Sequence, residues 1–85
     1  MSFVYIIKSS KTNWYYVGST ESLEQRLATH NRGEVKTTKS KRPLILVYSE
    51  KFDNITEARK RERQIKDQRI LKEKIINNLA SSSNG

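Results

Sequence analysis

The sequence contains no cysteine and no long apolar run. The absence of cysteine excludes disulfide bonds, thiolate zinc sites and cysteine nucleophiles, and it fits a reducing compartment. Every apolar run is far shorter than the ~20 residues that a membrane-spanning helix needs. The first ten residues, MSFVYIIKSS, lack the basic region and the cleavage site of a signal peptide. We therefore expect a cytoplasmic protein with no membrane partner.

Acidic residues are also scarce. Nine Asp and Glu stand against 17 Lys and Arg, which gives a formal net charge of +8 at pH 7. Such an excess is typical of proteins that bind a phosphate backbone, so DNA is the leading partner and RNA is the alternative. A basic surface that serves only solubility is the competing interpretation.

The length of 85 residues suits one compact domain and leaves no room for a second. We expect a single domain over residues 1–80 and a disordered tail over residues 81–85. We also expect the protein to act as a monomer, or together with a partner protein that supplies targeting.

Two β-branched and aromatic runs near the N-terminus predict a β-hairpin. They are residues 3–8 (FVYIIK) and 14–17 (WYYV), joined by the turn-forming residues SSKTN. Because side chains alternate between the faces of a strand, Tyr16 and Gly18 point the same way as Trp14. Three residues of the first strand likewise share one face: Phe3, Tyr5 and Ile7.

Helix signals occupy much of the remaining chain. Ser19 or Thr20 precedes the first helix as a cap, and Asn54 and Glu57 have the spacing of a capping box before the second. The apolar phase of the C-terminal half breaks near Asp67, which divides that half into two helices. The predicted helices span residues 21–32, 55–66 and 68–79.

Between the first two helices, the sequence predicts a basic loop at residues 34–42 and a third strand at 43–50. That strand (PLILVYSE) is apolar on both faces, so helices should cover at least one of them. The expected fold class is α/β, with a small three-stranded, mainly antiparallel sheet flanked by three helices.

Three polar residues stand out by their spacing. Arg26 and His30 are four residues apart in a predicted helix, so they lie on the same helical face. Glu62 falls on the inward stripe of its helix, between Ala58 and Ile65. Because an unpaired buried carboxylate is costly, two interpretations stay open: a structural pair with an arginine, or a ligand to a divalent cation.

The order of these residues resembles the GIY-YIG nuclease family. The resemblance covers residues 3 to about 66, through VY, then YVG eleven positions later, then LEQRLATH and TEARKRE. It implies a three-stranded sheet with one motif tyrosine on each of the first two strands. Carried over position by position, it makes Tyr5, Tyr16, Arg26, His30 and Glu62 the site residues, with Gly18 as the closing glycine.

The sequence departs from the family pattern at several positions. The opening triplet is FVY, and valine stands in the middle of the second triplet. Ser19 occupies the position where some members carry a basic residue. The late asparagine of some relatives has only weak candidates here, Asn77 and Asn78.

The resemblance implies a metal-dependent endonuclease that hydrolyses DNA phosphodiester bonds, in DNA repair or recombination. Glu62 would hold one Mg²⁺ or Mn²⁺, which stabilises the leaving oxygen, and Arg26 would grip the scissile phosphate. Tyr5 would take a proton from the attacking water, while Tyr16 and His30 orient the water or bond the phosphate. Which of these three side chains is the general base stays open.

Two other functions compete with nuclease activity. The first is a catalytically silent DNA- or RNA-binding module of the same fold. The second is a structural protein of a ribonucleoprotein particle, which needs the charge and not the site. A purely structural interpretation of the site residues makes Tyr5 and Tyr16 half-buried sheet residues, His30 a surface histidine, and Arg26 with Glu62 a buried ion pair.

Basic residues next to the first helix predict the path of the nucleic acid. We expect this phosphate track to consist of Arg32, Lys36, Lys39, Lys41 and Arg42. A solvated loop is the alternative interpretation. The second helix carries another basic group, but its members ring the helix, so several must face solvent. They are Arg59, Lys60, Arg61, Arg63 and Lys66.

Overall fold

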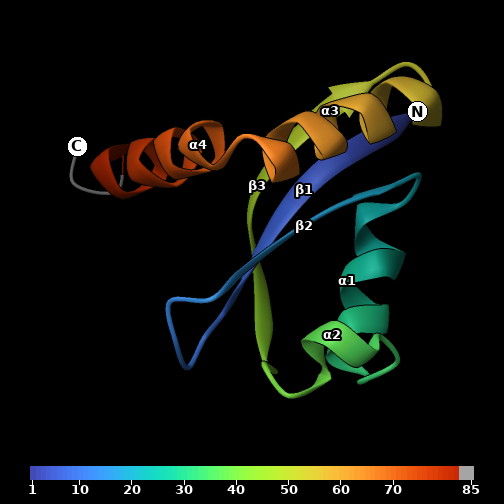
Figure 1. Cartoon of the computed structure of the whole chain (residues 1–85). Helices are drawn as coiled ribbons and strands as arrows, with labels where there is room; N and C mark the ends of the chain where they lie inside the picture. The colour runs from blue at the N-terminus through green and yellow to red at the C-terminus, as the bar shows by residue number, and fades with distance from the viewer. Residues whose placement is uncertain (83–85) are drawn as a thin grey trace.

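The computed structural model describes residues 1–82 as three strands and four helices (Figure 1). The α/β class and the three-stranded sheet agree with the prediction from sequence. In chain order the elements are β1 (Ser2–Ser9), β2 (Tyr15–Thr20), α1 (Leu23–Asn31), α2 (Lys36–Lys39), β3 (Leu44–Phe52), α3 (Ile55–Asp67) and α4 (Arg69–Ser82).

The sheet has the order β2-β1-β3, and both pairings are antiparallel. The central strand β1 is therefore covered by a neighbour on each side. Tyr5 lies opposite Gly18 of β2 and opposite Ser49 of β3, and the register with β3 shifts between Ile6 and Ile7. Since β1 is central, its side chains are buried on both faces of the sheet.

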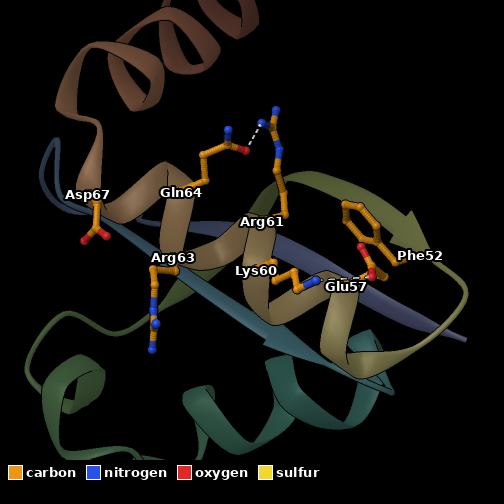
Figure 2. Close-up of a pocket in the computed structure, with 7 residues that line it drawn as sticks. All are labelled: Phe52, Glu57, Lys60, Arg61, Arg63, Gln64 and Asp67. Carbon is orange, nitrogen blue, oxygen red and sulfur yellow. Dashed lines mark hydrogen bonds and ion pairs between the residues drawn. The ribbon is translucent and has the colours of Figure 1, made fainter.

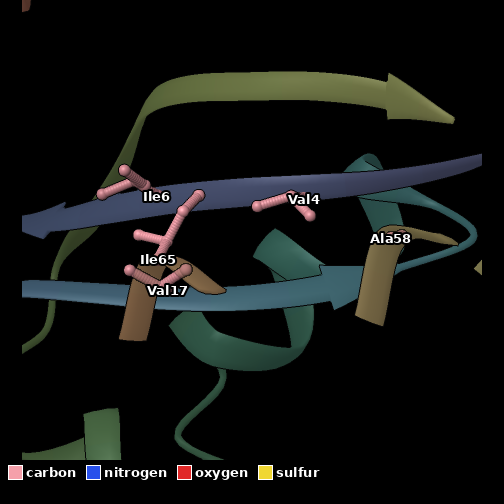
Figure 3. Close-up of a cluster of buried hydrophobic side chains, with 5 residues drawn as sticks. All are labelled: Val4, Ile6, Val17, Ala58 and Ile65. Atoms are coloured by element: carbon pink, nitrogen blue, oxygen red, sulfur yellow. The ribbon is translucent and has the colours of Figure 1, made fainter. Parts of the chain in front are cut away.

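Two helical layers cover the two faces of the sheet (Figure 1). On one face, α3 packs two buried residues, Ala58 and Ile65, against Val4, Ile6 and Val17 (Figure 3). We call these five residues the apolar cluster. On the other face, α1 packs against a second group, with Leu23 and Leu27 contacting the buried residues Tyr5, Ile7 and Leu44. Alternate residues of β1 therefore serve different faces, as its sequence predicted.

Local capping signals fix where the helices begin. The Asn54 side chain accepts a hydrogen bond from the Glu57 backbone N–H at 2.9 Å, as the spacing predicted. The cap of α1 was predicted wrongly: it is Ser22, which accepts from the Gln25 N–H. Ser19 and Thr20 remain in β2, so α1 begins later than expected.

Two further expectations are corrected. Residues Lys36–Lys39 form the one-turn helix α2 inside the segment predicted as a basic loop. Strand β3 is an edge strand of the sheet, and Ile45 and Leu46 are 48% and 40% exposed. Its other apolar residues pack against the groups that α1 and α3 cover, as expected: Leu44, Val47, Tyr48 and Phe52. The tail expected over residues 81–85 overlaps α4, which ends at Ser82, and residues 83–85 lie outside the described residues.

None of the helices described over residues 1–82 is both long enough and apolar enough to cross a membrane.

Candidate active site

The Tyr5 side chain lies in the sheet directly across from Gly18. The two residues are paired in the register of β1 and β2, and Tyr5 is only 2% exposed. A Cβ atom at position 18 would stand 2.5 Å from the ring carbon that carries the Tyr5 hydroxyl. The glycine of the second motif is therefore needed because a phenol occupies the space of its side chain.

Helix α1 brings Arg26 and His30 to the hydroxyl of Tyr5. Arg26 Nε donates to the Tyr5 oxygen at 3.2 Å, and His30 Nε2 lies 2.9 Å from the same oxygen. The i, i+4 spacing thus places both side chains on one face of α1, as predicted. His30 is completely buried, so it is not a surface histidine.

The second nitrogen of His30 has a partner that sequence reasoning missed. His30 Nδ1 lies 2.8 Å from Thr38 Oγ1, a fully buried hydroxyl that α2 supplies. The Thr38 hydroxyl in turn donates to the Val35 carbonyl at 3.4 Å. The basic composition of residues 34–42 gave no sign that one of its threonines would be buried.

The direction of both His30 contacts depends on the imidazole tautomer. We assign the proton to Nδ1, which then donates to Thr38, because the Thr38 hydroxyl donates its own proton to the Val35 carbonyl. A neutral imidazole then has an unprotonated Nε2, which accepts from the Tyr5 hydroxyl. The result is a polar chain of hydrogen bonds that runs from Arg26 through Tyr5 and His30 to Thr38.

The electrostatics of the site keep both central groups neutral. Burial raises the pKa of Tyr5 above its usual value, and this outweighs the lowering effect of the Arg26 guanidinium. Burial, reinforced by the charge of Arg26, lowers the pKa of His30 to about 4. At neutral pH Tyr5 is therefore a phenol and His30 is an uncharged base.

Tyr16 lies beside this chain on the same face of the sheet. Its ring centroid is 6.5 Å from that of Tyr5 and 5.2 Å from that of His30. The Arg26 guanidinium also interacts with Tyr16, which raises the pKa of the arginine in addition to the larger effect of Tyr5. The two motif tyrosines thus share one face of the sheet, next to His30.

Glu62 reaches the site from α3, at the edge of β2. Its Oε1 accepts from the Ser19 hydroxyl at 2.5 Å, and its Oε2 accepts from Lys66 Nζ at 2.6 Å. The side chain is 20% exposed, and its negative charge contributes to the raised pKa of Tyr5. Lys66 Nζ also lies 5.5 Å from the centroid of the Tyr16 ring. The carboxylate is therefore within electrostatic range of the phenol.

The pairing of Glu62 with an arginine, one of the two open interpretations, is not what the structure has. Its partners are a lysine one helical turn away and a serine on β2, and Arg26 bonds to Tyr5 instead. The i, i+4 position of Lys66 was a usable signal for the ion pair. The part played by Ser19 was not predictable, because it depends on how α3 crosses β2.

A divalent cation at Glu62 would have to be one that keeps much of its hydration shell. Within residues 1–82, no three His, Asp or Glu side chains lie together as a metal cluster. Mg²⁺ commonly binds one or two carboxylates and keeps several waters, whereas ions held entirely by protein need more ligands. Lys66 is 45% exposed at its side chain, so it is able to leave the carboxylate when such an ion binds.

The residues of the predicted phosphate track lie along the end of α1, α2 and the segment before β3. Arg32 forms an ion pair with Glu34 at 2.6 Å, so its charge is partly compensated. Arg42 Nε donates to the Lys39 carbonyl at 2.9 Å, and Lys41 Nζ lies 5.5 Å from the Trp14 ring centroid. Lys36 and Lys39 are exposed residues of α2.

The basic residues of α3 face several directions, as the sequence indicated. Figure 2 shows Arg61 and Gln64 on one side of the helix and Arg63 on the other. Arg61 is bonded to Glu50 at 3.0 Å and to Gln64 at 2.8 Å. None of the tyrosines, Arg26 or His30 lines the pocket drawn there, so it is separate from the candidate site.

The chain is similar in sequence to known proteins. A family model described as the GIY-YIG catalytic domain matches residues 1–74. The UPF0213 protein SH2523 of Staphylococcus haemolyticus is 49% identical over 65 residues, which cover 75% of this chain and 78% of that protein. The UPF0213 protein SSP2268 of Staphylococcus saprophyticus is 45% identical over 65 residues, with the same coverage.

The fold is similar to a solved structure as well. The solution NMR structure of the UPF0213 protein BH0048 from Bacillus halodurans superposes with a TM-score of 0.55 and 29% identity, covering 91% of this chain and 84% of that chain. The UPF0213 names state no activity, whereas the family model describes a catalytic domain. The chain therefore belongs to the GIY-YIG family, a family of nucleases.

Proposed function

We propose that this protein is a divalent-cation-dependent endonuclease that hydrolyses DNA phosphodiester bonds. The observation that carries the proposal is the position of the Tyr5 hydroxyl, which is held between Arg26 Nε at 3.2 Å and His30 Nε2 at 2.9 Å. The lowered pKa of His30, about 4, keeps its imidazole neutral at pH 7. A phenol in this setting has a neighbouring base for its own proton, which a tyrosine that serves only packing does not need.

Proton transfer follows from this chain of hydrogen bonds. The attacking water gives a proton to the Tyr5 oxygen as the Tyr5 proton moves to His30 Nε2, which becomes an imidazolium held by Thr38 at Nδ1. The Arg26 charge opposes this step in the free protein. A bound phosphate offsets that charge and raises the proton affinity of His30, so substrate binding activates the base.

The remaining site residues bind and orient the phosphate. Arg26 offers its guanidinium to the scissile phosphate while it positions Tyr5. Tyr16 lies beside Tyr5 on the same face of the sheet and interacts with the Arg26 guanidinium. Glu62, with Ser19 beside it, would hold Mg²⁺ or Mn²⁺ in place of Lys66. When bound there, the cation supplies charge neutralisation for the leaving oxygen.

A cleavage assay tests the proposal. The purified protein is incubated with supercoiled plasmid and with labelled duplex, single-stranded, flap and junction DNA, in Mg²⁺, Mn²⁺ or EDTA. We expect cleavage only with a divalent cation, and a loss of at least about a hundredfold in Glu62→Gln, because a transition-state charge is no longer neutralised. Binding of DNA should be retained.

Glu57→Gln is the matched control, because Glu57 is a carboxylate on the same helix, 54% exposed at its side chain and paired with Lys60 of α3. It should cleave like the wild type. Equal activity in Glu62→Gln would refute the assignment of the cation to this residue. Binding without any cleavage across the whole panel would instead indicate a catalytically silent nucleic-acid-binding module.

A further inference from the structure

Trp14 extends the face of the sheet that carries Tyr16. Its ring stacks on the Tyr16 ring, with centroids 6.2 Å apart and an angle of 25° between the planes. The Ser9 N–H donates to the Trp14 carbonyl at 2.9 Å, which continues the pairing of β1 with the chain just before β2. The indole is thus fixed at the border of the candidate site, one stacked ring away from Tyr5 and His30.

A lysine ammonium lies near each ring of this stack. Lys41 Nζ lies 5.5 Å from the Trp14 centroid, and Lys66 Nζ lies 5.5 Å from the Tyr16 centroid. The Lys41 backbone N–H donates to the Thr38 carbonyl, so the lysine is joined to the same α2 that orients His30. A stacked aromatic pair with lysines beside it is the combination by which proteins hold single-stranded nucleic acid: bases stack on rings, and ammonium groups contact phosphates.

The same strand provides an internal comparison. Tyr15 lies on the opposite face, where Lys8 Nζ is 6.0 Å from its ring centroid. That pair resembles the Trp14 and Lys41 pair in chemistry. Tyr15 packs against the apolar cluster. The Trp14 pair, in contrast, is next to residues that would hold a scissile phosphate.

We propose that the stack of Trp14 on Tyr16 is a nucleobase subsite, which takes one unpaired base next to the scissile phosphate. In the bound state the base covers the Trp14 ring in place of the Lys41 ammonium, and Lys41 moves to a phosphate. A base inside a duplex has both faces covered by its neighbours, so only an unpaired base can stack in this way. The inference rests on the proposed function for the position of the scissile phosphate.

This subsite narrows the substrate class. The strand that is cut must present an unstacked base at the site, as a single strand, a flap or the branch of a junction does. A continuous duplex must first open at the site and loses affinity by the free energy of unpairing. The ranking of substrates should therefore place single-stranded and flap DNA above duplex DNA of equal charge.

The fluorescence of the protein tests the subsite without catalysis, because Trp14 is the only tryptophan of the chain. The wild-type protein is titrated in EDTA with oligothymidylate, with an abasic oligonucleotide of equal length and charge, and with a hairpin duplex. We expect saturable quenching by oligothymidylate, and an affinity about tenfold lower for the abasic strand, because only the base can stack. Equal quenching and affinity for the two strands would overturn the proposal.

Variants sharpen this result, with binding measured by anisotropy of a labelled oligothymidylate. Trp14→Leu should weaken binding about tenfold, Trp14→Phe should keep most of the affinity, and Tyr15→Leu should bind like the wild type. The leucine variants each remove a half-buried ring, so circular dichroism of both controls for lost packing. Equal weakening in Trp14→Leu and Tyr15→Leu would refute a specific role for Trp14.

The outcome is separable from that of the nuclease proposal, because no divalent cation is present in the titration. Base-dependent quenching without cleavage in the metal assay would support the subsite and refute the endonuclease. Cleavage in the metal assay, with equal quenching by oligothymidylate and the abasic strand, would support the endonuclease and refute the subsite.

Discussion

The two faces of the sheet share the same strands and differ in what they are made of. On the α3 face, Val4, Ile6 and Val17 meet Ala58 and Ile65, and every member of this apolar cluster is at most 3% exposed. On the α1 face, the buried side chains include a phenol, an imidazole and a hydroxyl: Tyr5, His30 and Thr38. The apolar cluster of the α3 face is built from packing alone, whereas the buried group of the α1 face combines packing with a hydrogen-bonded polar chain.

The buried polar groups of the α1 face are stable because they are hydrogen-bonded to one another. Within residues 1–82, no buried side-chain nitrogen or oxygen lacks a hydrogen-bond partner. The polar chain of the α1 face therefore avoids the penalty of unpaired buried groups, which is about 1–3 kcal/mol each. Changes to the apolar cluster and changes to the polar chain should then have separable effects.

The largest expected effect is on the reaction, from a change on the α1 face. Arg26→Ala should reduce cleavage by about 10²–10³-fold, because the guanidinium that binds the phosphate and positions Tyr5 is lost. Its unfolding curve should stay close to that of the wild type. Arg69→Ala removes an arginine that is 90% exposed at its side chain on α4 and serves as the control. Wild-type cleavage by Arg26→Ala would contradict the proposed site.

A change on the α3 face should lower stability and leave cleavage nearly unchanged. Ile6→Ala should lower the free energy of unfolding by about 2–5 kcal/mol, because it opens a cavity in the apolar cluster. Cleavage per folded molecule should change little. Urea denaturation measures the first quantity and a cleavage assay at low temperature the second.

Ile6→Val is the milder variant, with an expected loss of about 1 kcal/mol. Ile70→Ala, at a residue that is 69% exposed, should leave stability within about 0.5 kcal/mol of the wild type. If Ile6→Val lost activity without losing stability, the separation of the two faces would be wrong.

The pH dependence of stability should reveal the burial of His30. Its pKa is lowered from 6.5 to about 4 in the folded protein, so between these values the unfolded chain binds the additional proton. The free energy of unfolding should therefore fall as the pH falls from 6.5 to 4, by up to about 3 kcal/mol from this group. Denaturation of His30→Gln over the same range should lack this component. Parallel pH profiles for the two proteins would mean that the histidine is not held neutral.

A smaller effect should follow from the orientation of the imidazole. In Thr38→Val the acceptor for His30 Nδ1 is lost, so the proton should move to Nε2 and cleavage should fall by roughly tenfold. Thr38→Ser keeps a hydroxyl and should keep both tautomer and activity. The ¹⁵N chemical shifts of His30, the only histidine of the chain, report the tautomer directly. An unchanged tautomer in Thr38→Val would contradict the donor and acceptor roles assigned to His30.

The smallest expected effect concerns the phosphate track. Neutralising Lys36, Lys39, Lys41 and Arg42 should weaken DNA binding and lower its salt slope by about one unit for each true contact. The unfolding curve and the metal dependence should not change. A control variant removes as many charges elsewhere, at Lys60, Arg69, Lys72 and Lys74. An unchanged salt slope in the first variant would mean that these four residues do not contact the DNA phosphates.

The sequence by itself determined the features that depend on neighbours along the chain. Strand alternation placed Tyr16 and Gly18 on one face, and helical spacing placed Arg26 next to His30. The cap at Asn54 followed from its spacing to Glu57. These features are local, because backbone geometry alone decides which side chains face the same way.

Tertiary structure decided the contacts that close the site. The bond from Tyr5 to His30 spans 25 residues of chain, and that from Ser19 to Glu62 spans 43. Neither distance follows from periodicity, because each depends on how a helix is placed against the sheet. The same reason explains the misjudged segment at residues 34–42, because α2 is located where Thr38 meets His30. Residue types and spacing thus supply the candidate groups, and packing selects which of them meet.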